Sequence, residues 1–303
     1  MSIKKKLQRK LLEILFKKNI LKSGKIMLND RAVKFRKIRE SNLLMDIFLN
    51  SLDAFEPELT TFLVKEKNTE YKYIIDAGSN TGILSACAEI GFPEASILSI
   101  EPIKINYEYI LEFKKINNFK FKVINCCLGN TCGNAKMYVP YGSGSSNISA
   151  TASLINSFKG TNQIYSHLEF REENVKMHKL DFILDNYFNE KFYDNGNTLI
   201  KLDCEGAELD IIKSSKALEK KNIDFIVEIM IGDKDKHVIF DLLIEKGFDA
   251  YLMTPASLIK EDRPLTLPNK SITNRTIWRN HYFTKKSISE VKEISINTYG
   301  NWI

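Results

Sequence analysis

From Tyr71 onward, short apolar runs alternate with longer segments whose apolar residues recur every three or four positions. Short runs rich in β-branched and aromatic residues are typical of buried strands, and the longer pattern is typical of helices packed on a sheet. The pattern predicts strands at 71–76, 97–101, 121–125, 175–180, 197–203, 224–229, 248–253 and 282–284. It predicts helices at 82–90, 104–116, 181–188, 206–220 and 235–246. Strands that alternate with helices need crossover connections, so we expect a doubly wound α/β fold with a mostly parallel, Rossmann-like sheet.

Two regions flank this alternation. Residues 41–67 predict a helix and then a second helix that starts at Glu56-Pro57-Glu58, and we found no internal repeat. We therefore expect three parts: a basic helical N-terminal extension over 1–55, one α/β domain over 56–285 and a polar C-terminal tail over 286–303.

The first residues form a basic amphipathic pattern. Residues 3–16 place apolar side chains at helical spacing with lysines and arginine between them. Such a helix could lie on an anionic membrane surface, or it could pack on the domain or on a second copy in a homo-oligomer. We favour packing, because the pattern is short.

The composition bounds the class of protein. Hydrophobic residues make up 44% of the 303 residues and charged residues 27%, which is typical of a soluble globular protein and excludes a fibre or a disordered tail. The net charge of +6 lies largely near the N-terminus rather than along a basic stripe. We therefore expect no nucleic-acid partner.

The cysteines and the lack of long apolar stretches indicate the cellular compartment in which the protein is found. The five cysteines are an odd number and contain no C-x-x-C pair, which favours a reduced setting over a disulfide framework. No apolar stretch reaches the length of a bilayer span, and the segment LLEILF is short and interrupted by Glu13. We expect a cytoplasmic protein. No histidine stands at metal-ligand spacing from Cys126, Cys127 or Cys132, which argues against a zinc site.

Three predicted strands end in acids, namely Asp76, Glu101 and Asp203. In a doubly wound sheet, ligands bind beyond the carboxyl ends of the strands, so these carboxylates should rim one crevice. Glu101 ends the second strand about 20 residues after a glycine loop, where a carboxylate accepts both hydroxyl protons of an adenosine ribose.

The glycine loop itself has the sequence IIDAGSNTG, with Gly78 and Gly82 four positions apart. A dinucleotide enzyme would show G-x-G-x-x-G, whereas a loop that begins with an acid suits the ammonium group of S-adenosylmethionine (SAM). Asp76 therefore favours SAM over a nicotinamide cofactor. A plain strand-to-helix turn capped by Asp76 stays open as the structural alternative.

Four blocks in order, IIDAGSNTG, SIEPIKINYEYILEFKKIN, IKLDCEGAELDIIKSS and IVEIM, resemble the FkbM-type methyltransferase family. The resemblance covers about residues 56–284. It implies a class I methyltransferase fold, SAM as the cofactor, and methyl transfer to a hydroxyl of a sugar or of a secondary metabolite. The acceptor partner would be a small molecule or a glycan, such as a surface polysaccharide or its precursor.

The resemblance also implies roles for individual residues. Glu101 would bind the ribose, with Pro102 and Asn106 in the same loop. The first block would hold the methionine part through Asp76, Gly78, Ser79, Asn80 and Gly82. The adenine is expected beside Asn125, Cys126 and Cys127. The family often has alanine at the position of Ser79, and it often has a histidine where this chain has Met230.

The chemistry needs a base for the acceptor hydroxyl, and three acids are candidates. Asp203 and Glu205 lie at a strand end and a helix start, and Glu228 ends the next strand. A purely structural interpretation, in which Glu205 caps the helix and Asp203 completes the turn, stays open. The three carboxylates could also act together as oxygen ligands of a divalent cation. His178 and His237 are weaker candidates, because a lone histidine is more often structural.

Alternatives from other classes also remain. One is a nucleic-acid methyltransferase, and another is a cofactor-binding protein without catalysis. The Gly/Ser-rich run GSGSSNISATAS, at 142–153, could close over the acceptor as a lid or binding loop, or be a plain disordered excursion.

Overall fold

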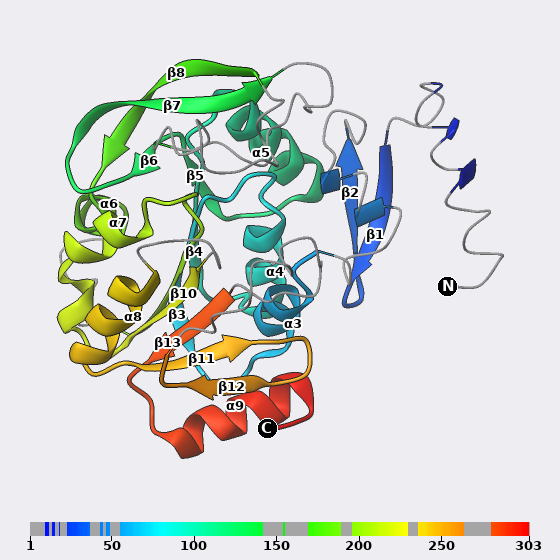
Figure 1. The fold of residues 1–303 in the computed structure, drawn as a ribbon. Helices are drawn as coiled ribbons and strands as arrows, with labels where there is room; N and C mark the ends of the chain where they lie inside the picture. Colours follow the sequence, from blue (N-terminus) through cyan, green and yellow to red (C-terminus); the bar gives the residue numbers. More distant parts are fainter. Residues whose placement is uncertain are drawn as a thin grey trace.

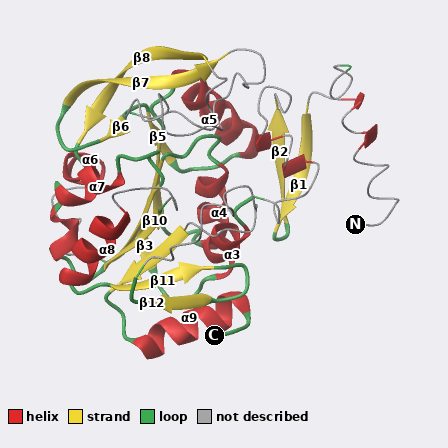
Figure 2. Cartoon of the chain, in the orientation of Figure 1, coloured by secondary structure: helices red, strands yellow, loops and turns green. Residues whose placement is uncertain are grey.

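The computed structural model describes residues 10–11, 14–15, 18, 23–36, 43–44, 47–48, 55–141, 154, 169–188, 196–229, 236–263 and 280–302. Within them, the core is one eight-stranded sheet with helices on both sides (Figures 1 and 2). Its strands are, in spatial order, β12 (Leu258–Glu261), β11 (Asp249–Met253), β13 (Asn280–Thr284), β10 (Ile223–Glu228), β9 (Asn197–Leu202), β3 (Tyr71–Ala77), β4 (Ser96–Ile100) and β5 (Lys122–Ile124).

The predicted α/β fold is confirmed, with one difference at an edge. Strands β5, β4, β3, β9 and β10 are parallel, as the alternation predicts. β13 runs antiparallel to β10 and to β11, and β12 is antiparallel to β11. The chain leaves β3 towards β5 and later returns beside β3 as β9, so the strand order reverses between β3 and β9. This reversal creates the crevice in which doubly wound sheets bind ligands.

Two hydrophobic cores hold the helices against the sheet, because successive strand residues point to opposite faces. Ile74 of β3 packs in the core with helices α3 (Pro57–Lys65), α4 (Ile83–Gly91) and α5 (Lys104–Asn117). Ile75 packs in the other core with α6 (Leu180–Phe188), α7 (Glu208–Lys213) and α8 (Lys236–Glu245). The two groups lie on opposite sides of the sheet in Figure 1. The predicted helix at 206–220 is in fact α7 followed by the 3-10 turn Lys216–Glu219.

A second, three-stranded sheet lies where the alternation was expected to pause. It contains β6 (Cys127–Leu128), β7 (Gly133–Tyr141) and β8 (Glu169–His178) in the order β6-β8-β7. The expectation of one strand at 175–180 was therefore incomplete. β7 and the first part of β8 were missed because one face of this antiparallel pair is exposed and charged, as the Lys136–Glu172 ion pair shows. The Gly/Ser-rich run at 142–153 lies outside the described residues.

The expectation of a helical N-terminal extension needs correction, because β1 (Ser23–Leu28) and β2 (Arg31–Arg36) form an antiparallel hairpin. A two-residue turn with Asn29 at φ 51° connects them. The hairpin packs on α5, where the Asn117 side chain accepts from the Lys34 N–H and donates to the Lys34 carbonyl. The described residues of 10–15 are helical, and most of 3–16 lies outside the described residues. Membrane contact or pairing of copies through that segment therefore stays a prediction.

The stretch expected to be a polar tail is also structured. It forms α9 (Ile288–Tyr299), which buries Val291 and Ile294 in the same core as α3. Ser287 and Glu290 form a capping box at its start. The S-x-x-E pattern that marks a helix start is present in the sequence, but the many polar residues of the exposed face obscured the apolar residues of the buried face.

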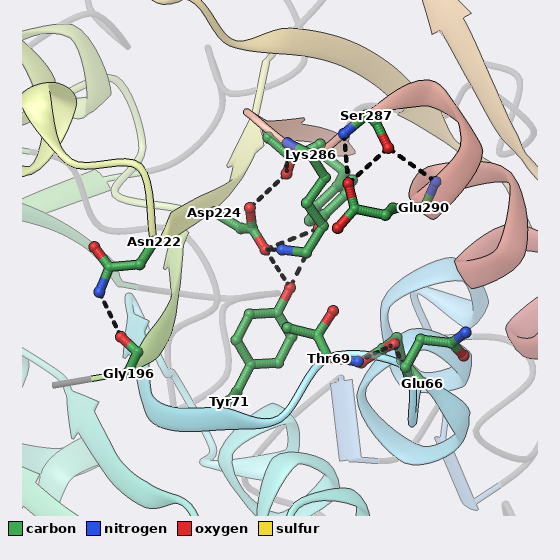
Figure 3. Close-up of polar contacts among 12 residues, drawn as sticks. Glu66, Thr69, Tyr71, Gly196, Asn222, Asp224, Lys286, Ser287 and Glu290 are labelled. Atoms are coloured by element: carbon green, nitrogen blue, oxygen red, sulfur yellow. Dashed lines mark hydrogen bonds and ion pairs between the residues drawn. The ribbon is translucent and has the colours of Figure 1, made fainter.

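Opposite the crevice, a buried polar network joins the amino edges of the strands to α9 (Figure 3). Asp224 of β10 accepts hydrogen bonds from Tyr71, at 2.6 Å, from Tyr282, at 2.9 Å, and from Thr284, at 2.6 Å. Lys286 pairs with the same carboxylate. Each polar group has a partner, so the network fixes β3, β10 and β13 relative to one another.

Candidate active site

A cavity of about 280 Å³ opens at the carboxyl edge of β3, β4, β9 and β10. Most of the candidate residues line it, although they come from five separate stretches of chain. These are Gly78, Ser79, Asn80, Glu101, Pro102, Asn106, Cys126, Cys127, Asp203, Glu205 and Glu228. The structure thus brings together the groups that the sequence assigned to one crevice.

The glycine loop after β3 packs directly on the turn after β9. Gly78 has φ 77°, a conformation that favours glycine, and its N–H donates to the Ile100 carbonyl at 3.0 Å. A Cβ atom at this position would lie 1.8 Å from the backbone oxygen of Asp203. The absence of a side chain therefore allows the two loops to meet.

Glu101 organises the loop after β4. Its carboxylate accepts from the backbone N–H of Asn80 at 2.8 Å, from the N–H of Ile103 at 3.0 Å and from Asn106 Nδ2 at 3.2 Å. Burial raises the pKa of Glu101 to about 7, against the opposing effect of these hydrogen bonds. The carboxylate faces the cavity and bridges the glycine loop and the start of α5, which is the position predicted for the ribose contact.

Three of the predicted cofactor residues stand behind the cavity wall rather than on it. Asp76 is buried, accepts from Ser85 Oγ at 2.6 Å and pairs with Lys201. Gly82 begins α4 with φ 75° against Ile110. The Asn125 amide donates to the carbonyls of Glu101 and Pro102. These residues shape the loops that the cavity-lining residues belong to.

The cavity has an apolar end. Cys126 and Cys127 lie there with Ile103, Leu128 and Met137, the last of which belongs to β7. Burial raises the pKa of both thiols to about 12, so they are neutral at physiological pH. A flat, apolar group such as a purine fits this end better than a charged one does.

The acidic end of the cavity is built on an unusual turn. Glu205 has φ 52°, in the left-handed region that residues other than glycine rarely adopt. The Glu208 carboxylate holds the turn from both sides, because it accepts from the N–H of Cys204 at 2.5 Å and from the N–H of Gly206 at 2.9 Å. Burial raises the pKa of Glu208 to about 7. Ala207 occupies the N-cap of α7, so the interpretation of Glu205 as a helix cap is wrong.

Asp203, Glu205 and Glu228 all line the cavity, together with Glu56 from the start of α3. Within the described residues, no group of three or more His, Cys, Asp or Glu side chains is arranged to hold a metal ion. His178 stacks on Phe182 and His237 is exposed on α8, and neither lines the cavity. Met230 lies outside the described residues.

Sequence reasoning missed two charged residues of the site. Lys201 contacts both the glycine loop and the Asp203 turn, and Glu208 accepts a hydrogen bond from the N–H of Gly206, next to Glu205. A signal was present for Lys201, because a lysine in the otherwise apolar strand 197–202 needs a buried partner.

The described residues fit the parts of SAM. Asn80 Oδ1 and Thr81 Oγ1 are buried beside the glycine loop and have no hydrogen-bond partner in the described part of the protein. They leave polar groups for an amino-acid moiety, while Glu101 and the two neutral thiols line the same cavity. A doubly wound sheet with this site defines the class of SAM-dependent methyltransferases.

Comparisons with known proteins give the family. The model of the FkbM methyltransferase domain matches residues 76–250, which is more than half of the chain. The protein belongs to the FkbM methyltransferase family. The predicted fold, the methyltransferase class and the cofactor SAM are thereby confirmed, and the nicotinamide and non-catalytic interpretations are not supported.

Curated relatives agree with this family. The chain is 25% identical over 222 residues to Methyltransferase sdnD of Sordaria araneosa, which covers 62% of this chain and 82% of that protein. It is 24% identical over 186 residues to Methyltransferase 1 of Beauveria bassiana (strain ARSEF 2860), covering 60% and 74%.

Solved structures show a weaker likeness. Precorrin-6y C5,15-methyltransferase of Geobacter metallireducens matches with 10% identity and a TM-score of 0.38, covering 75% of this chain and 85% of that one. The N-terminal domain of human METTL16 in complex with SAH matches with 10% identity and a TM-score of 0.34, covering 73% and 64%. In the described part of this chain, no helix combines the length and the apolar character needed to cross a membrane.

Proposed function

We propose that this SAM-dependent methyltransferase transfers its methyl group to a hydroxyl of a sugar, in a surface polysaccharide or its precursor, or of a small metabolite. The observation that supports the proposal is the set of carboxylates Asp203, Glu205 and Glu228 around the cavity that also holds the cofactor residues. Carboxylates accept hydrogen bonds from hydroxyl groups and can take up their protons.

SAM supplies an activated methyl group, so the protein must orient the acceptor oxygen and accept its proton. Orientation contributes on the order of 7–11 kcal/mol in such reactions, and a general base contributes roughly 10²–10⁴-fold in rate. The cavity walls, formed by the glycine loop, the Glu101 loop and Met137 of β7, provide the enclosure that orientation requires.

Among the three acids, Glu205 and Glu228 are the better candidates for the base. The Asp203 carboxylate lies 3.2 Å from Lys201 Nζ, so this oxygen is already engaged in an ion pair that links two loops of the site. Glu205 is held in its strained conformation by Glu208, and Glu228 ends the neighbouring strand β10.

The proposal is tested by methyl transfer from radiolabelled SAM to simple methyl glycosides, sugar nucleotides, small hydroxylated metabolites and RNA. We expect incorporation into a hydroxylated small molecule. Replacing the base, by Glu205→Gln or Glu228→Gln, should lower kcat roughly 10²–10⁴-fold and leave the Kd for SAM within about two-fold.

Asp210→Asn is the matched control, because Asp210 is an exposed acid on α7, shortly after the same turn. It should leave kcat unchanged. Incorporation into RNA, with none into any hydroxylated small molecule, would replace this proposal with a nucleic-acid substrate.

A further inference from the structure

Lys201 is a buried cation at the junction of the two loops that form the site. Its side chain is only 6% exposed, although lysine is rarely buried without partners. It stands directly beside Asp76 in the register of β3 and β9. The position is therefore determined by the sheet rather than by a mobile loop.

Three contacts engage its ammonium group. Nζ lies 3.3 Å from Asp76 Oδ1 and 3.2 Å from Asp203 Oδ2, and it donates to the Gly78 carbonyl at 3.2 Å. Asp76 precedes the glycine loop and Asp203 begins the turn that carries Glu205. One side chain thus joins the cofactor loop to the loop of the candidate base.

The acids around Lys201 keep it charged. Burial opposes the charge, but Asp203, Asp76 and Glu56 outweigh burial and raise its pKa well above the ordinary value for lysine. Glu101, across the cavity, also interacts with its charge. These acids come from four separate segments of the described chain, and Lys201 compensates part of their negative charge.

This compensation matters for a cofactor whose charge changes. SAM carries a positive sulfonium, and its product S-adenosylhomocysteine (SAH) is uncharged at sulfur, while the rest of the molecule is the same. Negative charge near the sulfur stabilises bound SAM more than it stabilises either SAH or the transition state, in which the sulfonium charge is already dispersed. An excess of negative charge would therefore tighten ground-state binding without accelerating the reaction.

We propose that Lys201 is a positioning residue that joins the glycine loop to the Asp203 turn and, through its charge, sets the preference of the site for SAM over SAH. The proposal rests on the SAM site and does not depend on which acceptor is methylated.

The experiment measures the Kd of SAM and of SAH separately by calorimetry, without an acceptor. Removing the charge by Lys201→Met should raise the ratio Kd(SAH)/Kd(SAM) about five- to fifty-fold, as expected for a unit charge several ångströms away at an effective dielectric constant of about 20. Lys201→Arg keeps the charge and should leave the ratio within about two-fold of the wild type.

Two further variants separate charge from shape. Asp203→Asn removes a negative charge and should lower the ratio, opposite to Lys201→Met. The double variant Lys201→Met/Asp203→Asn removes one charge of each sign, and it should return the ratio to within about two-fold of the wild type. Lys213→Met, which alters an exposed lysine on α7, is the matched control and should change neither Kd.

A loss of affinity for both compounds by the same factor in Lys201→Met would overturn the charge role and leave Lys201 as a structural residue only. If Lys201→Met does not fold, Asp203→Asn decides, because an unchanged ratio in that variant contradicts the proposal. Failure to find an acceptor would refute the proposed function without affecting this ratio.

Discussion

Gly78 illustrates how strongly one residue can constrain the site. Its positive φ would disfavour alanine by about 1 kcal/mol at any position, but the neighbouring Asp203 oxygen adds a contact that no Cβ atom can tolerate. The Asp203 oxygen is a backbone atom, and the backbone of residue 78 fixes where a Cβ atom would lie, so no side-chain rotation can relieve the contact. The glycine loop or the Asp203 turn would have to move.

We expect Gly78→Ala to weaken SAM binding at least about ten-fold. Gly247→Ala is the control, because Gly247 has a similar φ of 82° with open space around its missing Cβ. That variant should lose only about 1 kcal/mol of stability and bind SAM normally. Calorimetric titration and denaturant unfolding of both variants check the expectation, and equal SAM affinity in the two would show that the loop contact is unimportant.

At the scale of elements, the strands and helices that were predicted well are those buried on the sheet. β3, β4, β9 and β10 have continuous apolar runs, because helices cover both faces. The hairpin β1–β2 was missed because the basic residues of this segment obscured its alternation of apolar and basic positions, which is typical of a strand. The positions of Asp76, Glu101 and Asp203 could be predicted from their spacing along the chain. The contacts of Lys201 could not, because they depend on the pairing of β3 with β9, a strand more than 100 residues later in the sequence.

The hairpin contributes to the core and is more than an extension. Phe35 is fully buried, with its ring 5.0 Å from that of Phe113 in α5 and 5.7 Å from that of Phe48. We expect Phe35→Ala to lower the free energy of unfolding by about 3–5 kcal/mol, through lost burial and a residual cavity.

Met27 gives a control on the same hairpin, since it is 60% exposed. Met27→Ala should change stability by less than about 0.5 kcal/mol. Denaturant unfolding distinguishes the two variants. A wild-type midpoint for Phe35→Ala would mean that the domain does not depend on the hairpin.

At the scale of the whole molecule, one edge of the sheet forms the binding site and the opposite edge carries a network that stabilises the fold. The carboxyl edge carries the cavity, and the amino edge carries the Asp224 network that joins β3, β10, β13 and α9 (Figure 3). Glu66, at the end of α3, lies close to this network. It is fully buried, and its Oε1 accepts from the N–H groups of Asn68 and Thr69.

The pH dependence of stability follows from Glu66. Burial raises its pKa from 4.5 to about 7, although the two backbone hydrogen bonds and Lys286 oppose this shift. Between these two values the folded state holds a proton that the unfolded state has released, so stability falls as pH rises from 4.5 to about 7 and then levels off. Glu101 and Glu208 have pKa values raised in the same direction and add to this fall.

Glu66→Gln should remove the contribution of Glu66, because an amide does not titrate and its oxygen can still accept both backbone N–H groups. We expect the variant to match the wild type near pH 4.5 and to exceed its stability at pH 8 by up to about 3 kcal/mol, at about 1.4 kcal/mol per pKa unit. Glu94→Gln, at an exposed glutamate, should keep the wild-type pH profile. The free energy of unfolding, measured at several pH values between 4.5 and 8, checks both. A Glu66→Gln profile as steep as the wild type would mean that the carboxyl ionises in the folded protein as it does in water, and the fall in stability would then have to come from Glu101 and Glu208 at the opposite edge.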